Sequence, residues 1–256
     1  MRIILVGSSG TMGRNIINSS RLRGHEIVAG VDRFDIGDHF PVYEHISDIM
    51  LPADVVIDFS HPHLLIPTIE YCEKHHLPLI YGTTGIGEDD DDRLFELSRI
   101  VPVVRSSNFS FGMCVLKNLL AKATKLLKNN YDIEIIEMHH HNKADAPSGT
   151  AHMLFDIINA CCDDNLTPVY DRHSKYEKRS QNEVGISSVR GGSIVGEHEV
   201  VFAGDDEIIR LSHSAYSKSV FSTGALIAAE TIISKENGYY TMDNITDMIM
   251  DDMGEL

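Results

Sequence analysis

Residues 1–13 read MRIILVGSSGTMG, and they are the clearest indication of the fold. The apolar run 3–6 has the composition of a buried strand, and it is followed by three glycines at every third position, Gly7, Gly10 and Gly13. A strand, a glycine turn and a helix are typical of dinucleotide-binding folds, although the spacing here is GxxGxxG rather than GxGxxG. In such a turn Gly7 allows the tight bend, Gly10 lets a pyrophosphate approach the backbone, and Gly13 lets the helix pack closely. An ordinary glycine-containing turn is the alternative.

An acidic and a basic residue follow the next expected strand and suit the adenosine half of a dinucleotide. Asp32 lies 19 residues after Gly13 and could hold the ribose hydroxyls. Arg33 comes next and could bind a 2′-phosphate. The pair therefore predicts that both NADH and NADPH are accepted, with two ordinary surface charges as the alternative.

Strand and helix signals alternate over the first hundred residues. Short runs rich in β-branched residues indicate strands at 3–6, 27–31, 55–59, 78–81 and 101–104. Helical stretches lie between them, for example at 12–22 and 64–75, and the acidic run 88–92 suits the first turn of a solvated helix. Apolar strands that alternate with helices predict a parallel sheet covered on both faces.

Two further loops follow expected strands of this sheet. They are Gly82-Thr83-Thr84-Gly85 and Ser106-Ser107-Asn108-Phe109. Ligands of open α/β sheets bind at the carboxyl ends of the strands, so both loops are candidates for holding the ribose and the nicotinamide. Turn chemistry alone would explain the glycines, but it gives no reason for two consecutive threonines.

The pattern changes after about Asn108, which predicts a second domain. We expect helices at 111–128 and 150–161 on either side of a strand at 132–138, then a polar loop or lid at 163–182. Three later segments, 185–189, 199–202 and 207–213, are predicted to be antiparallel strands. A final helix around 220–234 is expected to precede an acidic tail.

Residues 137–150 read EMHHHNKADAPSGT and contain the candidate catalytic groups. Three histidines and Lys143 lie within five positions at the end of an expected strand. The following Pro-Ser-Gly-Thr introduces a helix, whose free amides at Gly149 and Thr150 would form an anion pocket. A histidine can supply a proton when hydride reaches a neighbouring carbon, and an ammonium lowers the cost of the negative charge that develops.

A metal site and an incidental polar turn are the alternatives for this histidine cluster. Consecutive histidines in a strand point to opposite faces, and neither HExxH nor a comparable carboxylate spacing is present. We therefore predict no metal.

Composition limits the function classes further. A formal net charge of −16 argues against nucleic acid and against an anionic membrane surface. An anionic substrate then requires a local basic cluster, which residues 139–143 provide. The four cysteines show no CxxC pair, and no apolar run has the length of a membrane span or a signal peptide, so we expect reduced cysteines and a cytoplasmic location.

These motifs together resemble the 4-hydroxy-tetrahydrodipicolinate reductase (dihydrodipicolinate reductase) family. The resemblance covers nearly the whole chain and rests on GSSGTMG (7–13), GTTG (82–85), SSNFSFG (106–112), EMHHHNKADAPSGTA (137–151), RGGSIVGEHEV (190–200) and HSAYSKSVFSTGAL (213–226).

The resemblance implies an α/β fold: a Rossmann-type dinucleotide-binding domain (1–109 and 220–256) and a mixed-sheet α+β domain for substrate and tetramer formation (110–219). It implies NADPH- or NADH-dependent reduction of the dehydrated form of 4-hydroxy-tetrahydrodipicolinate, a small dicarboxylate, in the diaminopimelate route of lysine biosynthesis. It makes His139 the proton donor/acceptor and Lys143 a second proton donor, and it assigns substrate binding to His140, Gly149 and Thr150. Cofactor binding falls to Gly7, Ser8, Ser9, Gly10, Thr11, Met12, Asp32, Arg33, Gly82, Thr83, Thr84, Ser106, Ser107, Asn108 and Phe109.

The sequence departs from the family pattern at two places. Lys218 stands where the family usually has arginine, which weakens any bidentate contact there. His141-Asn142 replaces a frequent arginine-histidine pair, so the roles of both residues stay open. Another Rossmann reductase acting on a different small acid, or a nucleotide-sensing protein that has lost catalysis, would be the alternative functions.

Overall fold

The computed structural model describes residues 1–35, 37–163, 165–173 and 176–252, which form two compact units. Unit 1 comprises Met1–Phe111 and Lys218–Leu256, and unit 2 comprises Gly112–Ser217. Each division lies two residues from the expected boundaries at 109/110 and 219/220. Each unit has its own sheet and its own hydrophobic core.

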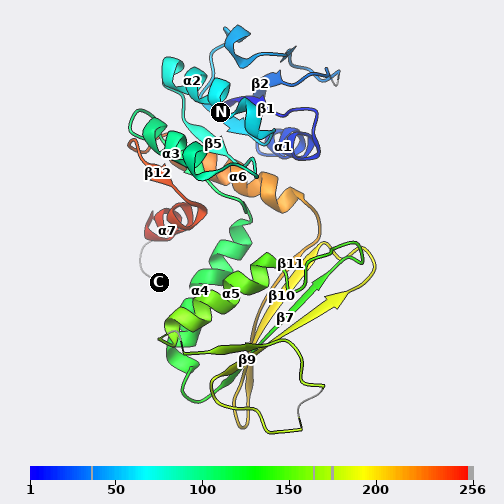
Figure 1. Cartoon of the computed structure of the whole chain (residues 1–256). Coiled ribbons are helices and arrows are strands. Elements are labelled where there is room, and N and C mark those ends of the chain that lie inside the picture. Colours follow the sequence, from blue (N-terminus) through cyan, green and yellow to red (C-terminus); the bar gives the residue numbers. More distant parts are fainter. Residues whose placement is uncertain (36, 164, 174–175, 253–256) are drawn as a thin grey trace. The chain divides into compact units, whose positions relative to one another are not determined.

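Unit 1 is built around a seven-stranded parallel sheet (Figure 1). In spatial order its strands are β12 (Tyr239–Tyr240), β6 (Val103–Arg105), β5 (Leu79–Tyr81), β4 (Val55–Asp58), β1 (Arg2–Val6), β2 (Glu26–Val31) and β3 (Val42–Tyr43). Its helices are α1 (Thr11–Leu22), α2 (Leu65–His75), α3 (Glu88–Leu97), α6 (Ser219–Ile232) and α7 (Met242–Asp252), with short 3-10 turns at Ile46–Asp48 and Pro62–Leu64.

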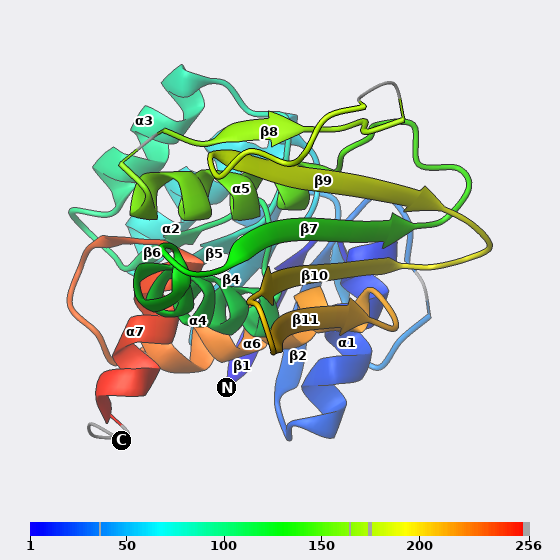
Figure 2. The same ribbon diagram turned by 90° about the horizontal axis from the view of Figure 1, so that it is seen from below.

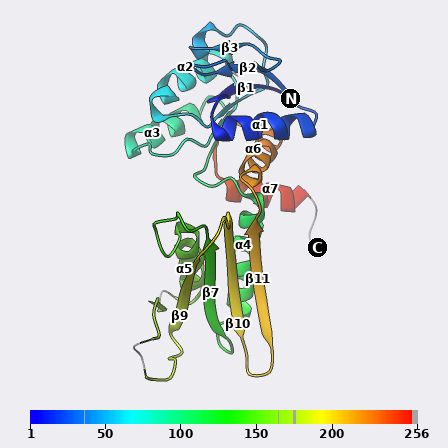
Figure 3. The ribbon, with the colours of Figure 1, turned by 90° about the vertical axis from the view of Figure 1, so that its right-hand side faces the viewer.

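Helices cover both faces of this sheet because the strand residues are apolar on both sides. The residues of β1 from Ile3 to Val6 are at most 1% exposed. One face packs against α2 and α3 in a continuous core, while α1 and α6 lie side by side (Figure 3). The chain passes from β1 outward to β2 and β3 and then returns to β4 on the other side of β1. The carboxyl ends of β1, β2 and β4 thus meet at a topological switch point, where such sheets bind ligands.

Unit 2 has a five-stranded mixed sheet covered on one face by two helices (Figure 2). The spatial order is β11 (Ile208–Ala215), β10 (Gly196–Ala203), β7 (Asp132–His139), β9 (Glu183–Arg190) and β8 (Thr167–Val169). The helices are α4 (Phe111–Leu127), whose first residue belongs to unit 1, and α5 (Gly149–Cys161). Every second residue of β7, from Ile133 to His139, is buried, so this face of the strand packs beneath the helices.

Three expectations about unit 2 and the C-terminal region are corrected by the structure. Strand β9 is not antiparallel to its neighbours: it pairs in parallel with both β7 and β8, because the chain from β7 crosses over through α5 before returning. Strand β8 lies within the stretch 163–182, which was expected to be only a loop or lid; residues 164, 174 and 175 of that stretch fall outside the described residues.

The expected acidic tail instead contains β12 and α7. Met242 and Ile245 of α7 are buried, so an amphipathic pattern underlies the acidic composition. Residues 253–256 lie outside the described residues.

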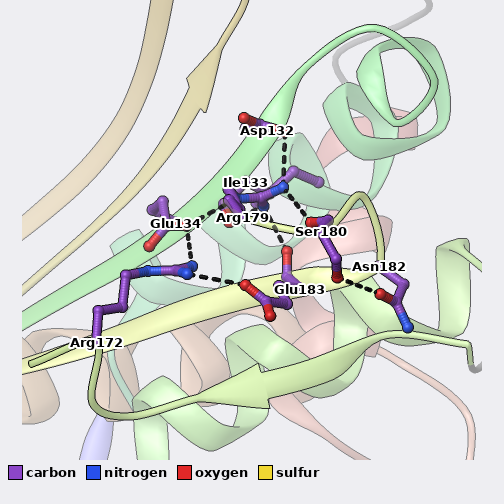
Figure 4. A network of polar contacts seen from close by, with 8 residues as sticks. All are labelled: Asp132, Ile133, Glu134, Arg172, Arg179, Ser180, Asn182 and Glu183. Carbon is purple, nitrogen blue, oxygen red and sulfur yellow. Dashed lines mark hydrogen bonds and ion pairs between the residues drawn. The ribbon is translucent and has the colours of Figure 1, made fainter. Parts of the chain in front are cut away.

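Two arginines fasten the connection between β8 and β9 to the amino end of β7 (Figure 4). Arg172 bonds to Glu134 at 3.1 Å and to Glu183 at 2.8 Å. Arg179 bonds to Asp132 at 2.7 Å and to Glu134 at 3.1 Å, and it also reaches the backbone carbonyl of Glu183. Arg172 and Arg179 therefore each attach the described part of the segment 163–182, which was expected to be a loop or lid, to the sheet of unit 2.

Candidate functional site

The glycine turn between β1 and α1 has the geometry that a dinucleotide site needs. Gly7 has a φ of +85°, and a Cβ there would lie 2.7 Å from the carbonyl oxygen of Phe59. A Cβ on Gly13 would lie 2.2 Å from the carbonyl oxygen of Gly7, so only glycine lets α1 approach this closely. Gly10 is the N-cap of α1 and has no side chain to cap the helix, so first-turn amides remain for an anion.

A pocket of about 580 Å³ lies at the carboxyl ends of β1 to β4. It brings together five of the expected cofactor residues, namely Gly7, Ser9, Gly10, Asp32 and Arg33. It also includes polar residues that the sequence analysis missed: Glu44, His45, Ser60, His61 and His63. These residues follow β3 and β4 in the sequence. Their position directly after two strands of the parallel sheet could have identified them as pocket residues. The two loops at 82–85 and 106–109 contribute nothing to the lining of this pocket.

Asp32 is already hydrogen-bonded within the turn. Its carboxylate accepts the backbone N–H of Ser9 at 2.9 Å and that of Arg33 at 2.8 Å. Partial burial tends to raise the pKa of Asp32, but the hydrogen bonds from Ser9, Arg33 and Phe34 outweigh it and hold the pKa below its ordinary value. The carboxylate is therefore ionised at neutral pH and suited to accept hydroxyl donors.

Two residues expected to contact the cofactor turn their side chains into the protein. Ser8 is fully buried, and its hydroxyl lies where a Cβ on Gly30 would come within 2.6 Å. The hydroxyl of Thr83 donates to Asp58 at 2.9 Å and accepts the backbone N–H of Ser60 at 2.7 Å. The neighbouring Thr84 is exposed.

The loop 106–109 is held by its own hydrogen bonds. The hydroxyl of Ser106 donates to the carbonyl of Asn108 and accepts that residue's N–H, at 2.7 and 3.1 Å. Phe109 is 1% exposed and packs against Phe59 with ring centroids 5.2 Å apart. A Cβ on Gly224 of α6 would lie 1.7 Å from the carbonyl oxygen of Phe109, so α6 closes directly on this loop. Phe109 can therefore offer a ligand only its backbone.

In unit 2, a buried carboxylate holds the candidate proton donor. Glu137 is fully buried, and its Oε2 lies 2.6 Å from Nδ1 of His139. Glu137 and His139 are two residues apart in β7 and so share the face beneath the helices. The Glu-x-His spacing within an expected strand could have predicted that these two side chains lie on the same face.

Arg190 completes a salt bridge with the same carboxylate. Its guanidinium donates to both oxygens of Glu137, at 2.8 and 2.7 Å, and to the carbonyl of Asp145 at 2.6 Å. Burial tends to raise the pKa of Glu137, but hydrogen bonds from Arg190, Ser188 and His139 lower it to about 2. Glu137 therefore stays charged. Arg190 was not foreseen, because only the β7–β9 register brings it beside this site.

Ser148 joins the start of α5 to this network. Its N–H donates to Glu137 at 3.2 Å, and its hydroxyl accepts the N–H of Ala151 as the N-cap of α5. The same hydroxyl lies 3.0 Å from Nε2 of His198, which stacks edge-on against His139 with centroids 5.2 Å apart. Burial and the nearby His139 lower the pKa of His198 to about 4, so His198 is neutral.

Two of the expected substrate residues, Gly149 and Thr150, follow Ser148 directly, and the third, His140, follows His139. Gly149 is exposed and a Cβ there would meet nothing within 4 Å, so no neighbouring side chain crowds the start of α5. Gly149 and Thr150 occupy the first two positions of α5, whose amides the Ser148 cap leaves available. Within the described residues, the buried Nδ1 of His140 has no hydrogen-bond partner.

Lys143 lies on the loop between β7 and α5 and pairs with Asp145. The distance from its Nζ to Oδ1 of Asp145 is 2.9 Å, and the ammonium lowers the pKa of that carboxyl. The carbonyl of Asp145 accepts from Arg190, so Lys143 is linked to the Glu137–His139 pair through two residues, Asp145 and Arg190. His141 is exposed on the same loop.

Two general features complete the description of the site. Within residues 1–35, 37–163, 165–173 and 176–252, no cluster of three or more His, Cys, Asp or Glu side chains is arranged to hold a metal ion. In the same part of the chain, no helix combines the length and the apolar character needed to span a membrane.

The chain is similar to known proteins over almost its full length. Residues 1–109 match the family model "Dihydrodipicolinate reductase, N-terminus", and residues 112–246 match "Dihydrodipicolinate reductase, C-terminus". A 4-hydroxy-tetrahydrodipicolinate reductase of Staphylococcus carnosus (strain TM300) is 49% identical over 96% of this chain and 99% of the relative. One of Staphylococcus aureus (strain JH9) is 46% identical over 96% of this chain and 100% of the relative.

A solved structure shares the fold. The dipicolinate-bound dihydrodipicolinate reductase of Paenisporosarcina sp. TG-14 superposes with a TM-score of 0.80 at 23% identity, over 96% of this chain and 99% of that one.

Proposed function

The chain belongs to the dihydrodipicolinate reductase family, and on this premise we propose that it reduces 4-hydroxy-tetrahydrodipicolinate, through its dehydrated form, to tetrahydrodipicolinate with NAD(P)H. The protein is an oxidoreductase, and its reaction belongs to the diaminopimelate route of lysine biosynthesis. The observation that carries the proposal is the 49% identity to a reductase across 96% of the chain. The reaction draws on the cellular pool of nicotinamide cofactor, so we propose the cytoplasm as its location.

The test is a steady-state assay with the condensation product of pyruvate and aspartate semialdehyde as substrate and with each cofactor in turn. We expect oxidation of NADPH or NADH to depend on this substrate. Reverse oxidation of tetrahydrodipicolinate by NADP⁺ should also be measurable. A reductase of another small acid would fail both assays but still bind a nucleotide, and a nucleotide sensor would turn over neither substrate.

A nicotinamide cofactor supplies hydride when bound, and the residues of unit 1 fit its nucleotide part. The uncapped first turn of α1 offers amides to a pyrophosphate, and the ionised Asp32 can accept ribose hydroxyls. The proposed cofactor residues are Gly7, Ser8, Ser9, Gly10, Thr11, Met12, Asp32, Arg33, Gly82, Thr83, Thr84, Ser106, Ser107, Asn108 and Phe109. Among these, Ser8, Thr83 and Phe109 would act through the backbone, since their side chains are buried.

Acceptance of both NADH and NADPH is proposed because Asp32 and Arg33 line the same pocket. We expect Arg33→Ala to raise the KM for NADPH about tenfold, the equivalent of about 1.4 kcal/mol, because a charge-assisted bond to the 2′-phosphate is lost. The KM for NADH should stay within about twofold, because NADH lacks that phosphate.

The control for this prediction is Arg99→Ala, which removes an exposed guanidinium paired with Glu96 outside the pocket. It should change neither KM. Equal losses for both cofactors in Arg33→Ala would contradict the assignment of Arg33 to the 2′-phosphate.

On the substrate side, we propose that the amides of Gly149 and Thr150 bind one carboxylate and that His140 contributes a further contact. Support comes from the accessible start of α5 and from the unpartnered Nδ1 of His140. The structure of the Paenisporosarcina sp. TG-14 reductase contains bound dipicolinate, which is a small dicarboxylate like the proposed substrate. Because the chain has a net charge of −16, binding of an anionic substrate requires a local positive charge, and Lys143 provides one.

We propose that His139 moves the proton and that Glu137 sets its tautomer. With its Nδ1–H donated to the Glu137 carboxylate, the imidazole keeps Nε2 as the atom that gains or releases a proton. Lys143 is the second proton donor, and its ammonium offsets negative charge that develops when hydride reaches the substrate.

A homotetramer is the proposed assembly, on the basis of the resemblance and of one open sheet face in unit 2. In the described chain no helix of unit 2 covers the face opposite α4 and α5, which carries the apolar side chains of Ile136, Met138, Val189 and Ile208. Light scattering coupled to gel filtration should give about four times the 28.5 kDa chain mass. A monomer mass at micromolar concentration would overturn the proposal.

A further inference from the structure

Asp58, at the carboxyl end of β4, has no role in the function proposed above, yet it is a completely buried carboxyl group. Burying a charge is costly unless donors surround it. The structure supplies four: the N–H and hydroxyl of Ser60, at 2.9 and 2.6 Å, the hydroxyl of Thr83 at 2.9 Å and that of Thr68 at 3.2 Å. Burial raises the pKa of Asp58, and the hydrogen bonds from Ser60 and Thr83 oppose that rise.

The two carboxyl oxygens serve different parts of unit 1. Oδ1 accepts all three bonds from Ser60 and Thr83, which belong to the loops after β4 and β5. Oδ2 accepts only from Thr68, which lies within helix α2. Ser60 lines the 580 Å³ pocket, whereas Thr68 lines an adjoining cavity of about 450 Å³. One oxygen thus bonds to the two loops and the other to helix α2.

The bonds at Oδ1 are linked to the glycine turn as well. Ser60 follows Phe59, whose N–H donates to the carbonyl of Val6 at 3.1 Å and whose own carbonyl lies against Gly7. The N–H of Gly82 donates to the carbonyl of Asp58 at 2.8 Å. Asp58 therefore joins the ends of three strands that surround the switch point.

We propose that Asp58 is a positioning residue for the cofactor, which shapes the loops after β4 and β5 into their binding conformation before the nucleotide arrives. This inference rests on the nucleotide site proposed above. It also accounts for the paired threonines at 83 and 84. The side chain of Thr83 points inward and donates to Asp58, whereas the exposed Thr84 can contact the ligand. Preformed loops reduce the ordering cost that binding must otherwise meet.

The test measures the dissociation constant of NADPH by fluorescence titration, without substrate. We expect Asp58→Leu, which removes both acceptor oxygens, to raise this constant at least about tenfold. Asp58→Asn keeps an acceptor at the Oδ1 position and should restore binding to within about threefold of wild type. In turnover assays the KM for NADPH should rise with the dissociation constant, while kcat at saturating NADPH should stay within about threefold.

A matched pair of threonine variants separates positioning from general stability. Thr83→Val and Thr68→Val each delete one buried hydroxyl that donates to Asp58, so both should lower the melting temperature, and Thr83→Val should do so more because its hydroxyl also accepts the N–H of Ser60. Only Thr83→Val should weaken NADPH binding, by about threefold to tenfold. This pair carries the test if Asp58→Leu does not fold.

Several outcomes would overturn the inference. Wild-type affinity in Asp58→Leu or Thr83→Val would do so, as would equal weakening by Thr68→Val and Thr83→Val. Absence of binding of both NADPH and NADH in the wild-type protein would instead remove the proposed nucleotide site itself, and with it this inference. The two failures are therefore distinguishable.

Discussion

Lys143→Ala is expected to lower kcat by at least about a hundredfold, the usual scale for removal of a proton-transfer group. The ammonium lies on the loop between β7 and α5, close to the amides of Gly149 and Thr150 in sequence and held by Asp145 at 2.9 Å. Its loss removes the proposed proton donor and a positive charge from the loop that we propose to contact the substrate. The measurement is steady-state turnover with saturating NADPH.

Two further lysine variants make this prediction specific. Lys125→Ala removes an exposed ammonium from the last turn of α4 and should leave kcat unchanged. Lys143→Arg keeps the positive charge but provides a group that does not release its proton near neutral pH. It should therefore remain close to the alanine variant, and full recovery by arginine would refute proton donation. Unchanged turnover in folded Lys143→Ala would refute any catalytic role.

Glu137→Gln is expected to lower kcat by about a hundredfold or more while leaving the dissociation constant of NADPH unchanged. The NH₂ group of a glutamine can donate to Nδ1 of His139, which favours the tautomer with its proton on Nε2 instead of the one that Glu137 holds. The proposed nucleotide site consists of residues of unit 1, whereas Glu137 belongs to the core of unit 2, so we expect NADPH binding to be unaffected. Single-turnover kinetics and NADPH titration measure the two effects separately.

The stability of this variant needs its own control, because Glu137→Gln leaves the guanidinium of Arg190 without its counter-charge. The double variant Glu137→Gln/Arg190→Gln removes both charges and should recover much of the melting temperature. Its kcat should stay low. Recovery of kcat together with stability would show that Glu137 acts only in folding.

The sequence predicted five of the seven strands of unit 1, because each of these five has a local signature, whereas the two-residue strands β3 and β12 were not predicted. Apolar runs mark β1 and β4, and Gly7 and Gly13 stand where a positive φ and a close helix contact require glycine. The direction of β9 had no such signature, since an alternating strand looks the same in parallel and antiparallel pairing. Helix α7 was missed because its acidic residues concealed the buried Met242 and Ile245.

The candidate site was predicted in part for the same reason. His139, Lys143 and Gly149 lie in one short motif, so their proximity follows from the sequence alone. Arg190 lies 53 residues from Glu137, and only the pairing of β7 with β9 brings the two together. Asp58 carried no signal of its own, because its three partners come from separate loops and a helix.

The contact between Gly224 and Phe109 bears on how the chain is made. Unit 1 is interrupted by unit 2, and both α6 and the edge strand β12 come from the segment after Ser217. During synthesis β6 therefore leaves the ribosome with an unpaired edge. More than a hundred further residues must be synthesised before α6 and β12 emerge and unit 1 can be completed. Unit 2 is contiguous and faces no such delay, so the middle of the chain can fold while the N-terminal part is still incomplete.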